Sequence, residues 1–435
     1  MLLTNPVVVS VVVMIVLCLL NLNVVLALLV AAVAAGVTAG ISIPETMGIL
    51  ISGMGGNSET ALSYFLLGTF AVAINKTGVA TIACKKIAKI VQGRKMMLLL
   101  IITGIACLSQ NLIPVHIAFI PILIPPLLHL FNQLKIDRRQ VACALAFGLK
   151  APYITLPVGF GLIFHGILSA EMSRNGMELA KEGVPQYVWI LGISMFIGLL
   201  IALFVSYNRP RNYEDRPIVG VEASEEVESL SRTHWLAALA ILVAFGVQLW
   251  SSSLPLGALA ALIVMIVTGA IKFKDIDETF MGGLEIMGLI AFVMLIAAGY
   301  GTVLRETHSV EHLVSAVVGM VGGSAFWGAF LMLFVGLLVT MGIGTSFGTI
   351  PVIAAIYCPL SIELGFSVGA TACLIAAAAA LGDAGSPASD TTLGPTAGLN
   401  ADGQHNHIWD TCVPTFLHYN IPLFIGAMIG ALVLY

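Results

Sequence analysis

The stretch LPLGALAALIVMIVTGAI, residues 254–271, carries no charged side chain and is nearly long enough to cross a bilayer as a helix. A second stretch, VVLALLVAAVAAGV at residues 24–37, has the same character. Both are continuously apolar, whereas a transmembrane β-strand alternates apolar and polar positions. Backbone groups in lipid must be hydrogen-bonded within their own segment, so these stretches predict α-helices that span a membrane.

The rest of the chain shares this composition. Of its 435 residues, 59% are hydrophobic and 10% are charged, against about 25% charged residues in soluble domains. Residues 1–20 lack a positively charged start, which predicts a first span and not a signal peptide. The net charge of −4 argues against a nucleic-acid partner. Spans are expected near residues 5–20, 23–42, 60–78, 96–113, 115–131, 141–164, 186–206, 235–250, 254–271, 283–304, 325–343, 345–360, 366–382 and 410–434.

A polar stretch at residues 207–233 divides the chain into a first membrane repeat, 1–206, and a second, 234–435. If this linker is cytoplasmic, most of the 19 Lys and Arg residues lie on its side, and the positive-inside rule is satisfied. We therefore expect a multi-pass protein of the bacterial inner (plasma) membrane with a cytoplasmic linker. Each half then crosses the membrane seven times, so the second half is inserted upside down. The basic residues expected on the opposite side are Arg174, Lys181 and Arg305.

Short sequence matches between the halves favour the same interpretation, because they recur at a nearly constant offset of 230–233 residues. The fold class predicted is an all-α polytopic membrane protein built of two inverted-topology repeats, with broken helices or re-entrant segments at the midplane. The matches are Pro121 with Pro351, Ala142-Cys143 with Ala372-Cys373, and Glu45-Thr46 with Glu278-Thr279.

Four segments interrupt the apolar pattern in places that correspond between the halves: residues 109–116, 148–157, 342–349 and 382–392. Each combines Gly or Pro with hydroxyl, amide or charged groups. Unwound backbone in hydrocarbon is costly unless it faces protein or a water-filled site, so the four segments predict a binding site. The alternative for any one of them is a kinked helix or a polar loop outside the membrane.

The segment 382–392 is rich in the hard oxygen ligands that a small cation such as Na⁺ prefers. A buried Asp can instead hold a proton, because desolvation raises its pKa. We expect Na⁺ or H⁺ as coupling ion and no other cofactor, with Asp383 and Asp390 as the carboxylate ligands of Na⁺. The predicted cation-binding residues are Asp383, Ser386, Ser389, Asp390, Thr391, Thr392, Thr345 and Ser346.

Lys150 lies 233 residues before Asp383, within the repeat offset. One hypothesis is that Lys150 fills the first half's ion position as a tethered cation, or neutralises a substrate carboxylate. The alternative is a lysine that snorkels to the cytoplasmic interface. The donors of the first half suit a carboxylate better than a bare cation, which favours an organic solute. The predicted substrate-binding residues are Gln110, Asn111, His116, Lys150 and Thr155.

The segments 344–349 and 382–392 resemble the signature segments of the NhaC-type Na⁺/H⁺ antiporters, a family of the ion transporter superfamily of inverted-repeat carriers. The resemblance covers essentially the whole chain, and the layout is most similar to a branch of amino-acid (histidine-type) permeases. It implies cation binding by the side chains of 383–392. This chain has Ala384-Gly385 where the family usually has Asn-Cys, which removes one amide ligand.

The function expected is a cation-coupled secondary active transporter that moves a small polar solute, an amino acid such as histidine, by alternating access. Its expected partners are membrane lipid and the solute, and the layout also suits a homodimer. The alternative in the same class is a Na⁺/H⁺ antiporter without an organic substrate. A channel and an intramembrane protease are less favoured, because the chain carries its own internal repeat and lacks the Gly-x-Gly-Asp and Gly-x-Ser-Gly patterns.

Overall fold

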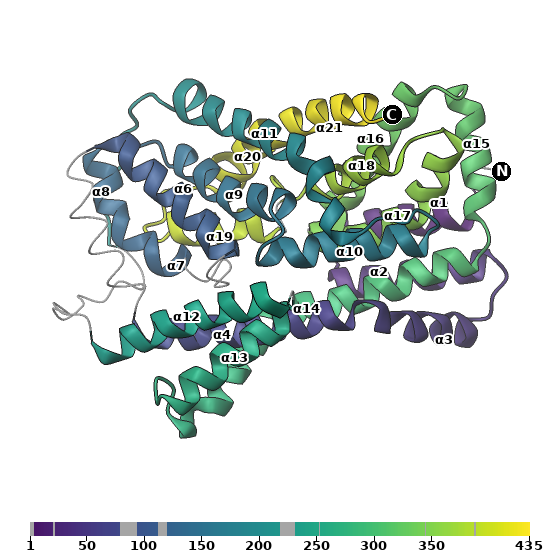
Figure 1. The fold of residues 1–435 in the computed structure, drawn as a ribbon. Coiled ribbons are helices and arrows are strands. Elements are labelled where there is room, and N and C mark those ends of the chain that lie inside the picture. The colour runs from purple at the N-terminus through teal and green to yellow at the C-terminus, as the bar shows by residue number, and fades with distance from the viewer. Residues whose placement is uncertain are drawn as a thin grey trace.

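The computed structural model describes residues 4–20, 22–78, 94–111, 120–217, 231–251, 253–343, 345–386 and 389–435. Within these ranges all regular structure is helical (Figure 1). The first half contains α1 (Pro6–Leu19), α2 (Val24–Thr38), α3 (Ile43–Met54), η2 (Gly55–Asn57), α4 (Ser58–Lys76), α6 (Lys95–Asn111), α7 (Ile120–Leu123), η4 (Pro125–Leu127), α8 (Leu128–Gln133), α9 (Arg138–Thr155), α10 (Phe160–Arg174), η5 (Lys181–Gly183), α11 (Pro185–Ile201) and η6 (Ala202–Ser206). The second contains α12 (Arg232–Ser251), α13 (Leu254–Val267), η7 (Phe273–Asp275), α14 (Ile276–Glu306), α15 (Val310–Val321), α16 (Ala325–Ile343), α17 (Ser346–Glu363), α18 (Val368–Ala380), α19 (Asp390–Leu399), η8 (His407–Cys412), α20 (Val413–Thr415), η9 (Phe416–Asn420) and α21 (Ile421–Val433).

Only some of these helices are, by themselves, long and apolar enough to cross a membrane. In the described part of the chain there are 4 such stretches, or up to 5 if the bent pair α9 and α10 forms one span. Most of the other apolar helices are shorter than 18 residues, as expected where spans are interrupted near a site. The four stretches are 181–206, Arg232–Ser251, Ser346–Glu363 and 407–433.

The helices form two layers. In the view of Figure 1, α2, α3, α4, α12, α13 and α14 make up the lower layer, and α6, α9, α11 and α16–α21 the upper one. The lower layer is organised by α14, a helix of 31 residues that packs against α2, α3 and α4. Its crossing with α4 depends on small residues, because a Cβ on Gly283 would lie 2.4 Å from Thr69 N. Glycine therefore lets the two backbones approach closely, as at many helix crossings in membranes.

The offset of 230 residues reappears in the helix boundaries. The helix α8 ends at Gln133 and α17 ends at Glu363. Two residues after each of these helix ends, the backbone takes the left-handed conformation, at Lys135 (φ 49°) and at Gly365 (φ 78°). The next helices, α9 and α18, follow the N-cap residues Asp137 and Ser367, whose side chains accept backbone N–H bonds. The two halves thus repeat the same stop and restart of a helix, whereas the inverted orientation of one half stays a prediction.

Two expected spans differ from the structure. The span expected at 141–164 is wrong as a single helix, because α9 ends at Thr155 and the chain bends by 47° into α10. Pro157 has no N–H to donate and Gly159 takes a φ of 60°, which together end the helix. The described part of the span expected at 115–131 is also divided, into α7, η4 and α8.

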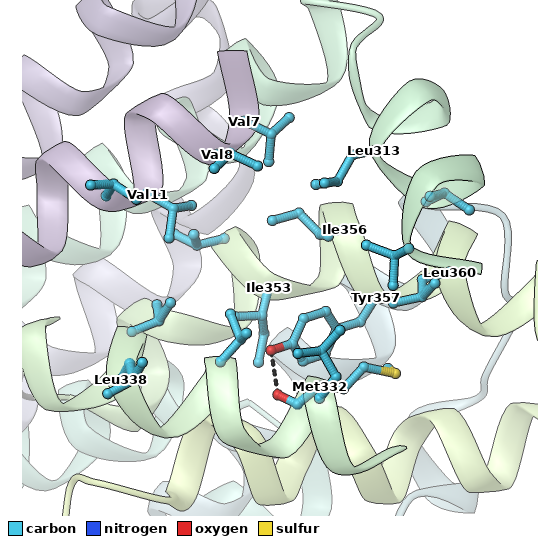
Figure 2. A pocket seen from close by; sticks show the side chains of 17 residues that line it. Val7, Val8, Val11, Leu313, Met332, Leu338, Ile353, Ile356, Tyr357 and Leu360 are labelled. Carbon is cyan, nitrogen blue, oxygen red and sulfur yellow. Dashed lines mark hydrogen bonds between the residues drawn. The ribbon is translucent and has the colours of Figure 1, made fainter. Parts of the chain in front are cut away.

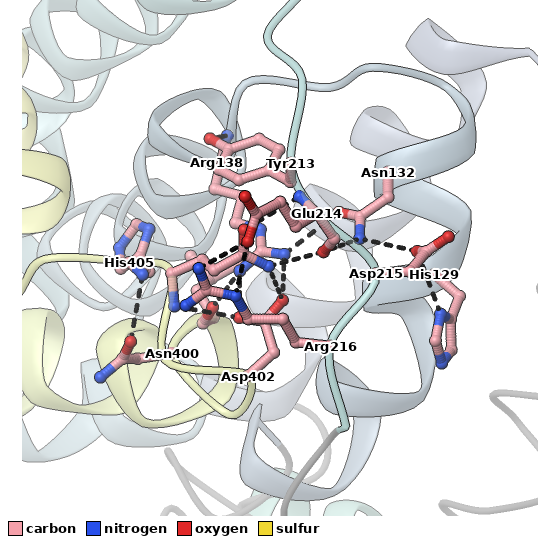
Figure 3. Close-up of polar contacts among 12 residues, drawn as sticks. His129, Asn132, Arg138, Tyr213, Glu214, Asp215, Arg216, Asn400, Asp402 and His405 are labelled. Atoms are coloured by element: carbon pink, nitrogen blue, oxygen red, sulfur yellow. Dashed lines mark hydrogen bonds and ion pairs between the residues drawn. The ribbon is translucent and has the colours of Figure 1, made fainter.

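The described start of the linker is tied to the protein and does not hang free in solvent. Arg138, fully buried at the first position of α9, forms a two-pronged ion pair with Asp402, in which each N···O distance is 2.6 Å. Tyr213 of the linker stacks on the Arg138 guanidinium at 4.3 Å, and its hydroxyl accepts a bond from Arg138 N (Figure 3). Linker, α9 and the loop after α19 therefore form one charged junction. Linker residues 218–230 lie outside the described residues.

His405 lies beside this junction and makes the stability of the fold depend on pH. Burial lowers its pKa from 6.5 to about 4, against the raising effect of Asp410. The folded ring therefore stays neutral at a pH where the unfolded ring is charged. The stability from His405 is complete above pH 6.5 and is lost as the pH falls toward 4. The loss amounts to about 3 kcal/mol.

We expect the apparent melting temperature of the detergent-solubilised protein to fall between pH 6.5 and 4, and to fall less in a His405→Asn variant. His129→Asn, at an exposed histidine, is the matched control and should keep the wild-type profile. An identical fall in the His405→Asn variant and the wild type would contradict this assignment.

An apolar cavity of about 280 Å³ lies between α1, α15, α16 and α17 (Figure 2). Its described lining is entirely apolar apart from the hydroxyl of Tyr357, which donates to the Met332 carbonyl at 2.5 Å. A cavity without a free polar group can hold neither an ion nor a polar solute. The candidate functional site must therefore lie elsewhere.

Candidate functional site

The site is built at the break between α18 and α19. The backbone unwinds after Ala380, and Gly382 and Gly385 take φ values of 82° and 106°, which other residues rarely adopt. One side chain pairs part of the unwound backbone, because Asn420 accepts from Gly382 N at 3.1 Å and donates to Ala384 O at 2.8 Å. Asn420 thus supplies hydrogen bonds that the unwound backbone would otherwise lack inside the protein.

The carboxylate of Asp383, 4% exposed, is the centre of this break. Its Oδ2 accepts hydrogen bonds from Ser346 Oγ at 2.6 Å and from Tyr153 OH at 3.2 Å. Its Oδ1 accepts a bond from Ser389 Oγ. The Nζ of Lys150 lies 3.0 Å from Oδ2. Residues from α9, α17 and the break therefore converge on one buried acid.

The local backbone also favours a negative charge at this point. The helix α17 begins at Ser346, and α19 begins directly after Ser389, which caps it by accepting from Thr391 N at 3.2 Å. Both capping-region hydroxyls donate to Asp383. The partly positive N-termini of two helices thus lie beside the carboxylate, an arrangement by which broken helices bind charged solutes.

Lys150 is fully buried, so the alternative of a snorkelling lysine is wrong. Its Nζ is within ion-pair distance of Asp383 but has no hydrogen-bond partner among the described residues. Charge attraction therefore holds the pair, and the donors of the ammonium are unused in the described part of the structure. A buried ammonium with unused donors is costly and is typical of a site that changes partners.

The remaining hydroxyls of the predicted cation set lie around the same loop. Thr391 Oγ1 donates to Asp383 O at 3.0 Å, and Thr392 Oγ1 donates to Ser389 O at 2.9 Å. Ser386 Oγ donates to Met341 O at 3.2 Å, and the half-buried Thr345 precedes α17. Because these hydroxyls donate their hydrogens to carbonyls, their oxygen lone pairs point to other partners.

Other predicted residues are not brought to the Asp383 network. The Thr155 hydroxyl donates to Ala151 O at 2.8 Å within its own helix, and its methyl group faces Gly192 of α11. Gln110 and Asn111 end α6, and Asp390 begins α19, but the side chains of these three lie outside the described residues, as does all of His116.

An aromatic cluster beside the acid was missed from the sequence. The Phe347 ring lies 5.0 Å from that of Tyr153, 5.8 Å from Tyr64 and 5.9 Å from Phe164, and Phe160 also contacts it. Tyr153 follows Lys150 by three residues, one helical turn, which places both side chains on one face of α9. This spacing could have predicted Tyr153 as a site residue from the sequence. No pattern in the sequence indicates the other rings.

A buried acid–base pair at a broken helix, inside an apolar helical fold, is the kind of site expected in a multi-pass membrane transporter. The chain belongs to the Na⁺/H⁺ antiporter family: the model of the "Na+/H+ antiporter family" matches residues 144–430, and a second model, the "Na+-H+ antiporter family", matches residues 5–91. The predicted family is thereby confirmed, as is the prediction that the protein is a transporter and not an enzyme.

Two relatives cover nearly the whole chain. An uncharacterized membrane protein of Vibrio parahaemolyticus is 50% identical over 99% of this chain and 100% of its own. A protein of Bacillus subtilis named "Putative amino acid transporter YuiF" is 49% identical over 91% of this chain and 92% of its own.

Two solved structures share the fold at low identity. The YdaH transporter of Alcanivorax borkumensis superposes with a TM-score of 0.61 at 12% identity, over 88% of this chain and 87% of that one. The MtrF structure of Neisseria gonorrhoeae gives 0.56 at 14% identity, over 89% of this chain and 84% of that one. The predicted all-helical polytopic fold agrees with these transporters.

Proposed function

We propose that this transporter carries a zwitterionic amino acid, such as histidine, coupled to Na⁺ or H⁺. The observation that carries the proposal is the buried pair of Lys150 and Asp383, 3.0 Å apart. A zwitterion can replace this contact on both sides, with its carboxylate at the ammonium and its ammonium at the carboxylate. Such an exchange leaves no charge unpaired in the protein interior, which is the main energetic obstacle to moving a charged solute there. The name of the relative from Bacillus subtilis supports an amino acid as the solute.

The coupling ion is proposed to act at Asp383. Opening the pair exposes a carboxylate surrounded by the hydroxyls of Ser346, Ser389 and Thr391, which are ligands of the type that Na⁺ binds. A proton on Asp383 would neutralise the same charge. The coupling ion and the solute ammonium therefore bind to one carboxylate, that of Asp383. When neither is bound, the positive charge of Lys150 neutralises it. We further propose that the protein lies in the bacterial inner membrane with its linker in the cytoplasm, and the homodimer remains a prediction.

The proposal is tested by uptake of each of the twenty radiolabelled amino acids into proteoliposomes with an imposed Na⁺ or H⁺ gradient. We expect saturable accumulation of at least one amino acid against its concentration gradient, abolished when the ion gradient is collapsed with an ionophore. Passive equilibration alone would indicate a channel. Failure of every amino acid to accumulate would refute the proposal.

Na⁺/H⁺ antiport without an organic solute is the second candidate, and the family description favours it. In that case Asp383 binds Na⁺ and a proton in turn, and it pairs with Lys150 when it holds neither. The same vesicles distinguish the two functions, because an antiporter moves protons out when only Na⁺ is added. That result together with no amino acid uptake would establish the second candidate.

A further inference from the structure

A polar cavity of about 290 Å³ lies between α4, α10, η5 and the start of α13. Its size is close to the lower end of small-molecule sites, about 300–1,000 Å³. The helices α4 and α13 belong to the lower layer of Figure 1, whereas α10 contacts α9 and α17. The polar groups of its described lining are the amide of Asn57, the hydroxyls of Ser63 and Ser169, and two opposite charges, Glu59 and Lys181.

Glu59 and Lys181 are not paired with other described residues. Neither the Glu59 carboxylate nor the Lys181 ammonium makes an ion pair or side-chain hydrogen bond within the described part of the chain. The Lys181 Nζ lies over Gly166 of α10, 3.8 Å from where a Cβ on that glycine would stand. The neighbouring Arg174 is by contrast engaged, since it donates to Glu171 at 2.5 Å and to Gly56 O at 3.0 Å. The exposed Glu59 and the half-buried Lys181 therefore line one cavity without forming an ion pair with each other.

This arrangement fits a zwitterion better than an ion of one sign. A lone cation would meet Lys181 and a lone anion would meet Glu59, so either would be repelled by one wall. A small solute with an ammonium and a carboxylate group can pair with both charges. The hydroxyls of Ser63 and Ser169 already donate to Glu59 O and Leu179 O, so they can only accept further hydrogen bonds, and the Asn57 amide oxygen can accept as well. The α-amino acids are the common solutes of this chemistry.

The cavity also adjoins the aromatic cluster that borders the buried pair. On α4, Ser63 lines the cavity and the next residue, Tyr64, contacts Phe347. On α10, Ile163 lines the cavity and the next residue, Phe164, lies 5.4 Å from the Tyr153 ring. The aromatic cluster is thus adjacent in the chain to residues of the cavity lining and contacts Asp383 through Tyr153, which donates to it.

We infer that this cavity is a second binding site for the amino acid, at which Glu59 holds the ammonium and Lys181 the carboxylate before the solute passes the aromatic cluster to reach Lys150 and Asp383. The inference rests on the proposed function, since it concerns the same solute. The uncharged hydroxyls and the amide of the lining then orient the bound amino acid. Glu59 and Lys181 together select zwitterions over singly charged compounds.

The test measures binding of each of the twenty amino acids to the full chain in nanodiscs, by thermal shift and then by equilibrium dialysis of the best-binding radiolabelled one. We expect two molecules bound per wild-type chain and one per chain of the Lys150→Gln/Asp383→Asn double variant. In that double variant, adding Glu59→Gln or Lys181→Gln should raise the Kd about tenfold. The methyl ester and the N-acetyl derivative of the same amino acid should bind at least about tenfold more weakly for the same reason. The exposed residues Glu182 and Lys274 provide matched controls, Glu182→Gln and Lys274→Gln, with unchanged Kd.

Each other outcome decides against the inference. One molecule per wild-type chain and none on the double variant would remove the second site and leave the proposed function intact. An unchanged Kd in both charge variants would place the second molecule elsewhere. If the double variant does not fold, the wild-type stoichiometry compared with that of Glu59→Gln alone decides the question. Absence of any amino acid binding would refute the proposed function as well.

Discussion

Replacing Asp383 by Asn is expected to lower the initial rate of amino acid uptake by about 100-fold or more, because the buried charge of the solute or the coupling ion then lacks its partner, at a cost of about 3 kcal/mol or more. Lys150→Gln should have a similar effect. Each single variant leaves one charge unpaired at a site that is 4% exposed or less, so each should also destabilise the protein by about 3–5 kcal/mol. Uptake in proteoliposomes and apparent melting temperature in detergent measure the two effects separately.

The double variant Lys150→Gln/Asp383→Asn distinguishes a functional pair from a structural one. Since it removes both charges, it should recover most of the lost stability. It should not recover uptake, because neither the solute nor the coupling ion finds its charged partner. A double variant that transports at the wild-type rate would show that the pair only stabilises the fold. The variant Ser361→Ala, which removes a buried hydroxyl with no hydrogen bond among the described residues, is the matched control for substitution in the core.

Replacing Arg138 by Met is expected to destabilise the protein by about 3–5 kcal/mol, since it leaves the Asp402 carboxylate buried without its partner. Both side chains are almost fully buried, with exposures of 0% and 1%. The guanidinium also donates to Leu399 O at 2.9 Å and carries the Tyr213 ring on its face, so the linker should loosen as well. A large fall in apparent melting temperature and faster proteolysis within residues 207–217 are the measurements.

Arg216 provides the matched control because it forms an ion pair with the same 2.6 Å distance at the surface, with Glu214. Solvent screens exposed pairs, so Arg216→Met should cost less than about 1 kcal/mol. The double variant Arg138→Met/Asp402→Leu should approach wild-type stability, since no charge then remains buried. An Arg138→Met protein as stable as Arg216→Met would disprove the assigned role of the buried pair.

The two cavities show why shape alone does not locate a site in this fold. The cavity of Figure 2 is nearly as large as the one beside Glu59, yet its described lining has no free polar group. Lipid tails are as apolar as the lining of such a cavity. The cavity therefore offers no interaction that would select a polar solute. Unpaired charges such as Glu59 and Lys181 are the more informative feature.

The sequence by itself determined the helical membrane class, the positions of most helices and the break at 382–392. These follow from local rules, since continuous apolar stretches must be helical in lipid and dense clusters of Gly, Pro and Ser, such as the one at 382–392, favour an interruption of the helix. The sequence also marked Lys150 and Asp383 as corresponding positions of two repeats. It did not show that they touch, because a contact across 233 residues depends on how the helices pack.

Only the tertiary structure decided what surrounds that pair. It brought Tyr153 and Ser346 to Asp383 and the ring of Phe347 beside them, while it used the Thr155 hydroxyl within its own helix. It also put Arg138 against Asp402, 264 residues away in the chain. The physical reason is that a helix presents its side chains in every direction, and which of them become buried together is set by packing against distant segments.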